Sequence, residues 1–155
     1  MMQDELNQGR VSELDTGTCR QLLGSHSIGR LAFNADPSPE VLPVNYTVHD
    51  AILFRTGEGA KHDAAVSRRA ATFEVDGSDA ARRSGWSVMV HGTLDIVEVS
   101  ADALQMLPQP LPGGSRDYLV RLTVERISGR RIPPEAGWAL PLHVWRGRDA
   151  SDLMG

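Results

Sequence analysis

Short apolar runs that alternate with polar residues, each bounded by turn residues, constrain the fold of this chain most strongly. In residues 28–34, Gly29, Leu31 and Phe33 lie on one face and the intervening residues on the other, which is the period of a strand. Residues 41–48 and 51–56 form two more such runs, and only two residues separate them, as in a hairpin. Later runs cover residues 71–77, 86–99 and 117–132.

About six strands with two or three short helices predict a mainly β fold. The strands are joined by short turns, which favours an antiparallel sheet closed into a small barrel. Parallel strands need long crossovers, and the sequence has none. Proline cannot donate to a ladder, so Pro43 indicates an edge or bulged position, and the run 86–99 is expected to bend at Gly92. We expect the barrel to be filled by Leu31, Phe33, Leu53, Phe54, Phe73 and Val88.

Short helices and terminal segments complete the expected organisation. A helix is predicted to begin after Asp15 or Thr16 as cap and to end at Gly24. Two more are predicted within residues 59–70 and 100–109. Residues 1–13 are expected to be a flexible N-terminus, residues 14–132 one domain, and residues 133–155 a proline-marked C-terminal tail.

Charge and cysteine content narrow the expected partners and location. The net charge of −4 argues against nucleic acid as a partner, because proteins that follow phosphate backbones usually present a basic face. No apolar run approaches the roughly 20 residues that cross a bilayer, so no membrane association is expected. The single cysteine, Cys19, excludes an internal disulfide and agrees with a reducing compartment. We therefore predict a cytoplasmic protein.

The only lysine among the 16 basic residues, Lys61, follows a glycine-containing turn in the stretch RTGEGAK. Arg55 offers a planar fork of donors, Thr56 a hydroxyl, and Lys61 a compact charge near a helix start. Gly57 and Gly59 would let the backbone approach a ligand closely. These are the groups that a phosphate needs, although a solvated hairpin end would present the same residues.

Five motifs in order raise the weight of the phosphate interpretation: GRLAF, PVNY, LFRTGEGAK, FEVD and GWSVMVHG. From about Leu14 to Ile132, the chain resembles the FMN-binding split-barrel family, which includes flavoproteins similar to pyridoxamine 5'-phosphate oxidase. The resemblance implies a six-stranded antiparallel split barrel with short flanking helices. It also implies a homodimer with two flavin sites at the subunit interface.

The same resemblance assigns cofactor-binding roles to individual positions. It implies that Arg55, Thr56 and Lys61 hold the phosphate. His62, next to Lys61, could support it, although a solvated helix residue is the preferred interpretation. The strand containing Val44 and Asn45 would contact the polar edge of the isoalloxazine ring through backbone groups. A further set would reach the flavin of the partner subunit: Trp86 and Ser87. Ala60 replaces the Thr or Ser common before this lysine, which would weaken phosphate binding by roughly 1.5–3 kcal/mol unless another donor substitutes.

The resemblance implies an FMN-dependent oxidoreductase that acts on a small-molecule substrate. A deazaflavin-dependent reductase would use the same basic residues, and a non-catalytic module for flavin or haem is a third interpretation. A flavin carries its own redox chemistry, so no acid–base group of the protein is nominated as catalytic.

The remaining candidates have simpler interpretations. Glu74 and Asp76 lie two residues apart on one strand face, and an ion pair with a nearby arginine is preferred to an acid–base site. Cys19 is expected to be a core thiol. Trp86 is as compatible with packing as with flavin contact, and the Arg130–Arg131 pair could meet a ligand, a second subunit or solvent. The five histidines show no ligand spacing, so no metal site is predicted.

Overall fold

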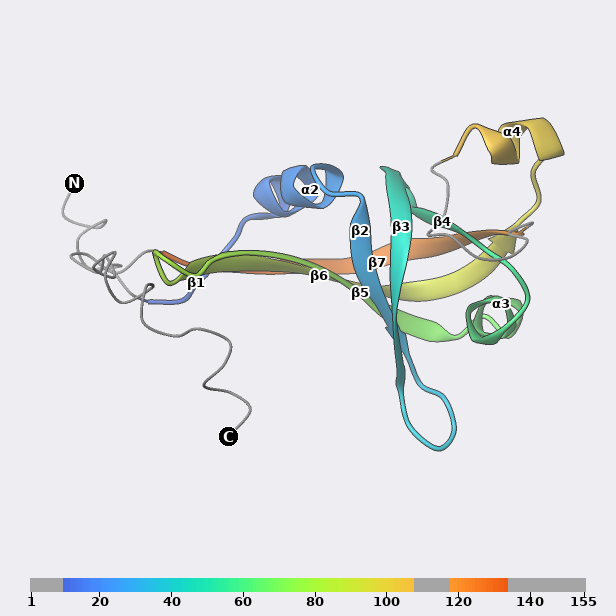
Figure 1. Cartoon of the computed structure of the whole chain (residues 1–155), viewed down its shortest axis with the longest axis horizontal. Coiled ribbons are helices and arrows are strands. Elements are labelled where there is room, and N and C mark those ends of the chain that lie inside the picture. The colour runs from blue at the N-terminus through green and yellow to red at the C-terminus, as the bar shows by residue number, and fades with distance from the viewer. Residues whose placement is uncertain (1–9, 108–117, 134–155) are drawn as a thin grey trace, which may run out of the picture.

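The computed structural model describes residues 10–107 and 118–133. Seven strands and three short helices make up this part of the chain (Figure 1). The strands are β1 (Ser12–Glu13), β2 (Ile28–Phe33), β3 (Glu40–His49), β4 (Ala51–Thr56), β5 (Ala70–Asp79), β6 (Ser84–Val97) and β7 (Tyr118–Ile132). The helices are α2 (Thr16–Gly24), α3 (Ala60–Val66) and α4 (Ala101–Gln105).

Six of the strands close into a barrel. Their order is β7-β4-β3-β2-β5-β6, and β6 pairs back with β7, so the sheet has no free side there. Every pairing is antiparallel, with registers such as Phe54 opposite Val120 and Phe73 opposite Val90. The predicted mainly β, six-stranded antiparallel barrel is therefore confirmed. The short strand β1, inside the N-terminal segment expected to be flexible, pairs with the far end of β7.

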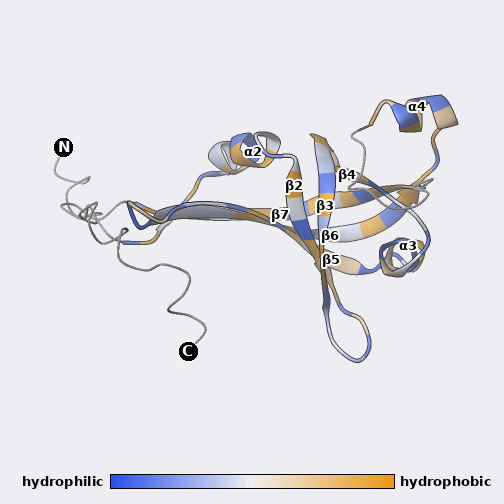
Figure 2. Cartoon of the chain, in the orientation of Figure 1, coloured by the Kyte–Doolittle hydropathy of each residue, from blue (hydrophilic) through white to orange (hydrophobic). Residues whose placement is uncertain are grey.

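The core lies inside the barrel, where every second residue of each strand points inward. Along β2, Leu31 and Phe33 are buried while Ile28 and Arg30 are exposed, as the alternation predicts. Figure 2 shows this alternation of hydrophobic and hydrophilic residues along the barrel strands. The predicted interior residues Leu31, Phe33, Phe54 and Phe73 belong to one buried cluster.

Two residues expected inside the barrel take other positions. Leu53 is only partly buried and lies outside the core cluster, so that prediction is wrong. Its neighbours Ile52 and Phe54 point inward, and consecutive strand residues point to opposite sides. Val88 is fully buried, but it lies outside the main cluster, farther along the β6–β7 ribbon.

The ribbon formed by β5, β6 and β7 extends beyond the barrel toward β1, and α2 lies over it (Figure 1). Cys19 of α2 is fully buried, and its Sγ would be 2.6 Å from a Cβ at Gly129, so β7 needs glycine there. The core-thiol prediction is thus confirmed, and burial raises the pKa of Cys19. A bulge separates His91 from Gly92 on β6, at the predicted bend.

Local sequence signals account for the helix ends and for the proline in β3. Asp15 caps α2 by accepting a 2.8 Å hydrogen bond from the Thr18 backbone N–H. The helix predicted within residues 59–70 ends at Val66, since Arg68 has a positive φ of 51°. Pro43 pairs with Arg30 of β2, whereas β3 pairs with β4 only from Tyr46 onward, so the predicted edge position is confirmed. The predicted tail, apart from Pro133, lies outside the described residues.

Within residues 10–107 and 118–133, none of the helices has the length and apolar character needed to cross a bilayer.

Candidate functional site

The residues predicted to hold a phosphate gather where β4 ends and α3 begins. Arg55 and Thr56 are the last two residues of β4, and Lys61 and His62 follow in the first turn of α3. The connecting turn depends on Gly59, whose φ of 136° is a conformation that residues with a Cβ rarely adopt. The chain therefore brings a guanidinium, an ammonium and an imidazole into one short segment.

Arg55 and Thr56 point to opposite sides of β4. Thr56 is 3% exposed, and it lies opposite Tyr118 in the barrel wall. Arg55 points outward and is half-buried, with its Nη1 atom enclosed by protein. The Arg55 side chain is therefore the one placed to meet a ligand outside the barrel, whereas Thr56 would contribute chiefly its backbone.

His62 packs against the start of β7. Its ring centroid lies 4.3 Å from that of Tyr118, and its Nδ1 lies 3.3 Å from the Asp63 carboxylate. The His62 side chain is only 20% exposed. It is therefore a packed residue beside Lys61, and the preferred interpretation as a solvated helix residue is wrong.

Val44 and Asn45 lie on β3, beside the same region of β4. Val44 is 4% exposed and points into the barrel, while Asn45 points outward and is half-buried. The β3–β4 ladder begins at the pair of Tyr46 and Phe54, just after these two residues. Val44 can therefore meet a ligand outside the barrel only through its backbone, which is the kind of contact that the resemblance implies, and Asn45 shares the outward side with Arg55.

Trp86 and Ser87 lie on the β5–β6–β7 ribbon and point to opposite faces of it. Trp86 pairs with Gly77 and Arg131, and Ser87 pairs with Asp76 and Arg130. Paired antiparallel residues share a face, so each face carries one of the two arginines. The two side chains therefore point to opposite faces of the ribbon, although both residues line a second pocket of about 340 Å³ together with Arg130.

A pocket of about 500 Å³ adjoins Trp86 on the face that it shares with Arg131. The indole packs edge-on against His26, with ring centroids 4.9 Å apart. It also covers Gly77, where a Cβ would be 2.7 Å from the indole nitrogen. Trp86 therefore packs against His26 and Gly77 and also lines the pocket.

The predicted site residues therefore form two groups in one subunit. Arg55 pairs with Leu119 near the start of β7, and Trp86 pairs with Arg131 near its end. Leu119 and Arg131 are 12 residues apart, a path of about 40 Å along the strand. The structure brings Asn45, Arg55, Lys61 and His62 into one region, and it keeps Trp86 and Ser87 apart from them.

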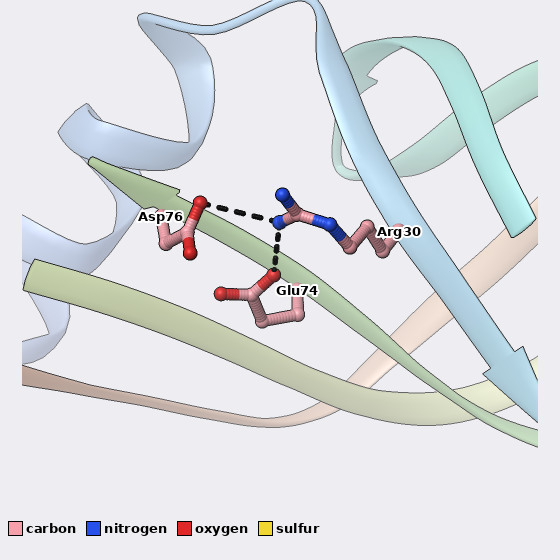
Figure 3. Close-up of polar contacts among 3 residues, drawn as sticks. All are labelled: Arg30, Glu74 and Asp76. Atoms are coloured by element: carbon pink, nitrogen blue, oxygen red, sulfur yellow. Dashed lines mark hydrogen bonds and ion pairs between the residues drawn. The ribbon is translucent and has the colours of Figure 1, made fainter. Parts of the chain in front are cut away.

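The two carboxylates noted in the sequence, those of Glu74 and Asp76, both form ion pairs with Arg30, as predicted (Figure 3). Arg30 Nη1 donates to Glu74 Oε2 at 2.9 Å and to Asp76 Oδ1 at 3.2 Å. The Asp76 hydrogen bond, followed by that of Glu74, raises the pKa of Arg30. These carboxylates are engaged on the outer face of β5, so they offer no acid–base pair.

Sequence reasoning missed the partners that come from distant segments. His26 and Trp86 are 60 positions apart, and His62 and Tyr118 are 56 apart, so no local pattern links them. A glycine inside a strand often marks the close approach of another group. Gly77 was therefore the signal in the sequence for the Trp86 indole that packs over it. Among residues 10–107 and 118–133, no three side chains of the His, Cys, Asp and Glu types are grouped as metal ligands would be.

The closed six-stranded barrel, with a basic group at the end of β4 and a β5–β6–β7 ribbon that carries Trp86, defines a split-barrel protein. The chain matches the pyridoxamine 5'-phosphate oxidase family over residues 15–131, and it belongs to this family.

Three relatives illustrate the similarity. The uncharacterized protein Rv0080 of Mycobacterium tuberculosis is 34% identical over a 130-residue alignment, which covers 79% of this chain and 86% of that protein. The structure of the FAD-binding protein from Mycobacterium smegmatis is 33% identical with a TM-score of 0.60, covering 78% of this chain and 97% of that one. A conserved protein of unknown function from Corynebacterium diphtheriae is 26% identical with a TM-score of 0.61, covering 79% and 98%.

Proposed function

We propose that this protein is a flavin-dependent oxidoreductase that binds FMN and acts on a small-molecule substrate. The observation that carries the proposal is the group of Arg55, Lys61 and His62 at the end of β4, in a chain that is acidic overall. The 33% identity to a structure named as an FAD-binding protein supports a flavin as the ligand. When bound, a flavin supplies the electron-transfer chemistry, and the protein supplies binding and orientation.

The residues of the basic group fit a phosphate. Arg55 offers a planar fork from a half-buried position, so its donors have a fixed direction. Lys61, in the first turn of α3, adds a compact positive charge to the same group. His62 is held against Tyr118 and can donate from a ring N–H. Asn45 lies beside Arg55 on the outer side of the barrel, where its side chain or backbone would meet the ring edge.

A site shared between two subunits would reconcile the two separated groups. The phosphate group of one subunit would then face the ribbon of its partner, which carries the partner's Trp86 and the partner's Ser87. Three apolar residues on the outer face favour such coverage: Ile28 is 51% exposed, Val41 59% and Met89 38%. Ile28 pairs with Asn45, so part of this apolar face adjoins the proposed ring site. A two-fold symmetric dimer would bury the face on both subunits.

The identity of the flavin is tested by the absorption spectrum of the purified protein and the mass of the released cofactor. FMN is our proposal, and FAD is the second candidate because the 33% identical structure is named for it. A deazaflavin spectrum would support the reductase alternative, and haem bands would support the module. A protein that comes out colourless and takes up no flavin on titration would overturn the proposal.

Catalysis is distinguished from simple storage by turnover. The proposed enzyme, loaded with FMN and given NADH or NADPH, should reduce a quinone or nitroaromatic acceptor. Flavin that stays oxidised with both nicotinamides, together with failure of reduced deazaflavin to support acceptor reduction, would favour a non-catalytic module. We also propose a cytoplasmic location, which the lone buried Cys19 supports because it needs no oxidising compartment.

A further inference from the structure

The pocket beside Trp86 is built for a flat ligand. It measures about 500 Å³ and lies at the end of the ribbon, between the β5–β6 hairpin and the segment that follows α2. Trp86 and His26 supply aromatic rings, and Gly77 and Gly85 keep the adjoining backbone bare. Pockets for small molecules commonly combine such apolar walls with a few polar groups.

The aromatic wall is held in place from two sides. A Cβ at Gly77 would lie 2.7–2.9 Å from three atoms of the indole, so the absence of a side chain lets Trp86 lie against β5. His26 meets the indole edge-on, and its Nδ1 lies 2.8 Å from the Ser25 hydroxyl oxygen. The backbone next to His26 is anchored by the Tyr46 N–H, which donates to the Ser27 carbonyl at 2.9 Å. A ligand would thus meet a pre-organised ring.

The charge of the pocket comes from Arg131. Arg131 is paired with Trp86 across the β6–β7 ladder, so the guanidinium and the indole share a face. The carboxylate of Asp79 also lines the pocket, but Arg82 approaches it to 3.7 Å and its backbone N–H donates to it at 3.2 Å. The acidic group is thus already engaged, and Arg131 remains to favour an anion.

We propose that this pocket receives the reaction partner of the flavin, and that this partner is a planar conjugated molecule bearing a carboxylate or phosphate. Its ring lies against Trp86 and His26, and its anionic group accepts hydrogen bonds from the Arg131 guanidinium. The assignment rests on the proposed function only in naming the ligand as the substrate. The pocket lies on the ribbon, which in the shared site faces the partner's flavin.

Equilibrium dialysis of anthranilate, an aromatic carboxylate, tests the proposal on the full chain with and without flavin. Anthranilamide is the uncharged matched probe. Arg131→Gln removes the positive charge that lines the pocket, and Arg130→Gln removes an equally exposed charge on the opposite face of the ribbon. Gly77→Ala should displace the indole without changing charge.

We expect Arg131→Gln to weaken anthranilate binding about tenfold or more, as for loss of a charged hydrogen-bond partner. Arg130→Gln should change it less than about twofold, because the Arg130 guanidinium lies on the opposite face of the ribbon and cannot donate a hydrogen bond to a ligand in this pocket. Gly77→Ala should weaken anthranilate binding, and anthranilamide should bind wild type about tenfold more weakly than anthranilate. Equal effects of the two arginine substitutions, or equal binding of the two probes, would overturn the proposal.

Flavin loading separates this proposal from the proposed function. Anthranilate binding should persist when flavin is bound, whereas its abolition by flavin would show that the pocket holds the cofactor instead. Flavin affinity is measured on the same samples by absorbance. Loss of flavin binding by wild type alone would overturn the proposed function while leaving the pocket chemistry standing. Anthranilate binding that Arg131→Gln does not weaken would overturn the pocket proposal and leave the proposed function standing.

Discussion

Gly29→Ala tests whether the barrel interior is packed as the structure shows. Gly29 is buried at the start of β2, opposite Val44. A Cβ there would overlap Cζ of Phe73 and lie 2.8 and 2.9 Å from its two Cε atoms. Phe73 is fully buried and meets the Tyr46 ring edge-on at 4.7 Å, so it has little room to move. The GRLAF motif therefore begins with glycine for a packing reason.

The expected loss of stability follows from two opposing terms. Overpacking costs about 1–3 kcal/mol, and replacing glycine regains about 0.4–1 kcal/mol from the unfolded chain. We expect a net loss of about 1–2 kcal/mol, which lowers Tm by roughly 2–8 °C for a chain of this size. Thermal and urea unfolding monitored by circular dichroism measure both quantities.

Gly24→Ala is the matched control for Gly29→Ala. Gly24 ends α2, and a Cβ there would meet nothing within 4 Å. The same substitution should therefore stabilise the protein by about 0.4–1 kcal/mol. A Gly29→Ala protein as stable as wild type, or shifted in the same direction as Gly24→Ala, would refute the packing argument.

Three further predictions concern charge. Lys61→Ala should weaken FMN binding by about 2 kcal/mol or more and Lys61→Arg by less; flavin titration that finds Lys61→Ala equal to wild type would remove the phosphate site. Burial raises the pKa of Tyr46 to about 12, above the value near 10 of an unfolded chain. Stability from this group is therefore complete below about pH 10 and is lost as pH rises toward 12, and Tyr46→Phe should show a smaller loss in urea unfolding between pH 9 and 11.5. Arg30→Ala should lower stability only slightly, since the ion pair is exposed, and the loss measured by urea unfolding should shrink in high salt. A loss that salt leaves unchanged would contradict the exposed ion pair.

The period of the strands made most of the fold predictable. In β2 one face is buried and the other exposed, so alternation alone identified both the strand and its inward residues. The error at Leu53 arose in β4, where Ala51, Ile52 and Phe54 are all buried and apolar residues fall on both faces. Hydrophobicity cannot identify the inward face of such a strand.

The candidate site was predictable only where it is local in sequence. Arg55, Lys61 and His62 lie within eight consecutive positions, so one motif revealed them together. His26 and Arg131 reach Trp86 through pairing and packing between distant segments, which no short motif encodes. The strand period implies opposite orientations for Trp86 and Ser87, although the resemblance assigned both to one flavin, and their neighbours required the register of β5, β6 and β7.

The most direct test of a flavin site shared between subunits is flavin titration of a mixed dimer. One subunit carries Lys61→Ala and the other Trp86→Ala, with different affinity tags so that sequential purification isolates the mixed species. In a shared site, one of the two sites has both substitutions and the other has none. We predict one flavin bound per dimer with wild-type affinity, while each homodimer binds weakly. Two equally weakened sites in the mixed dimer, or a monomer that retains flavin, would contradict the account.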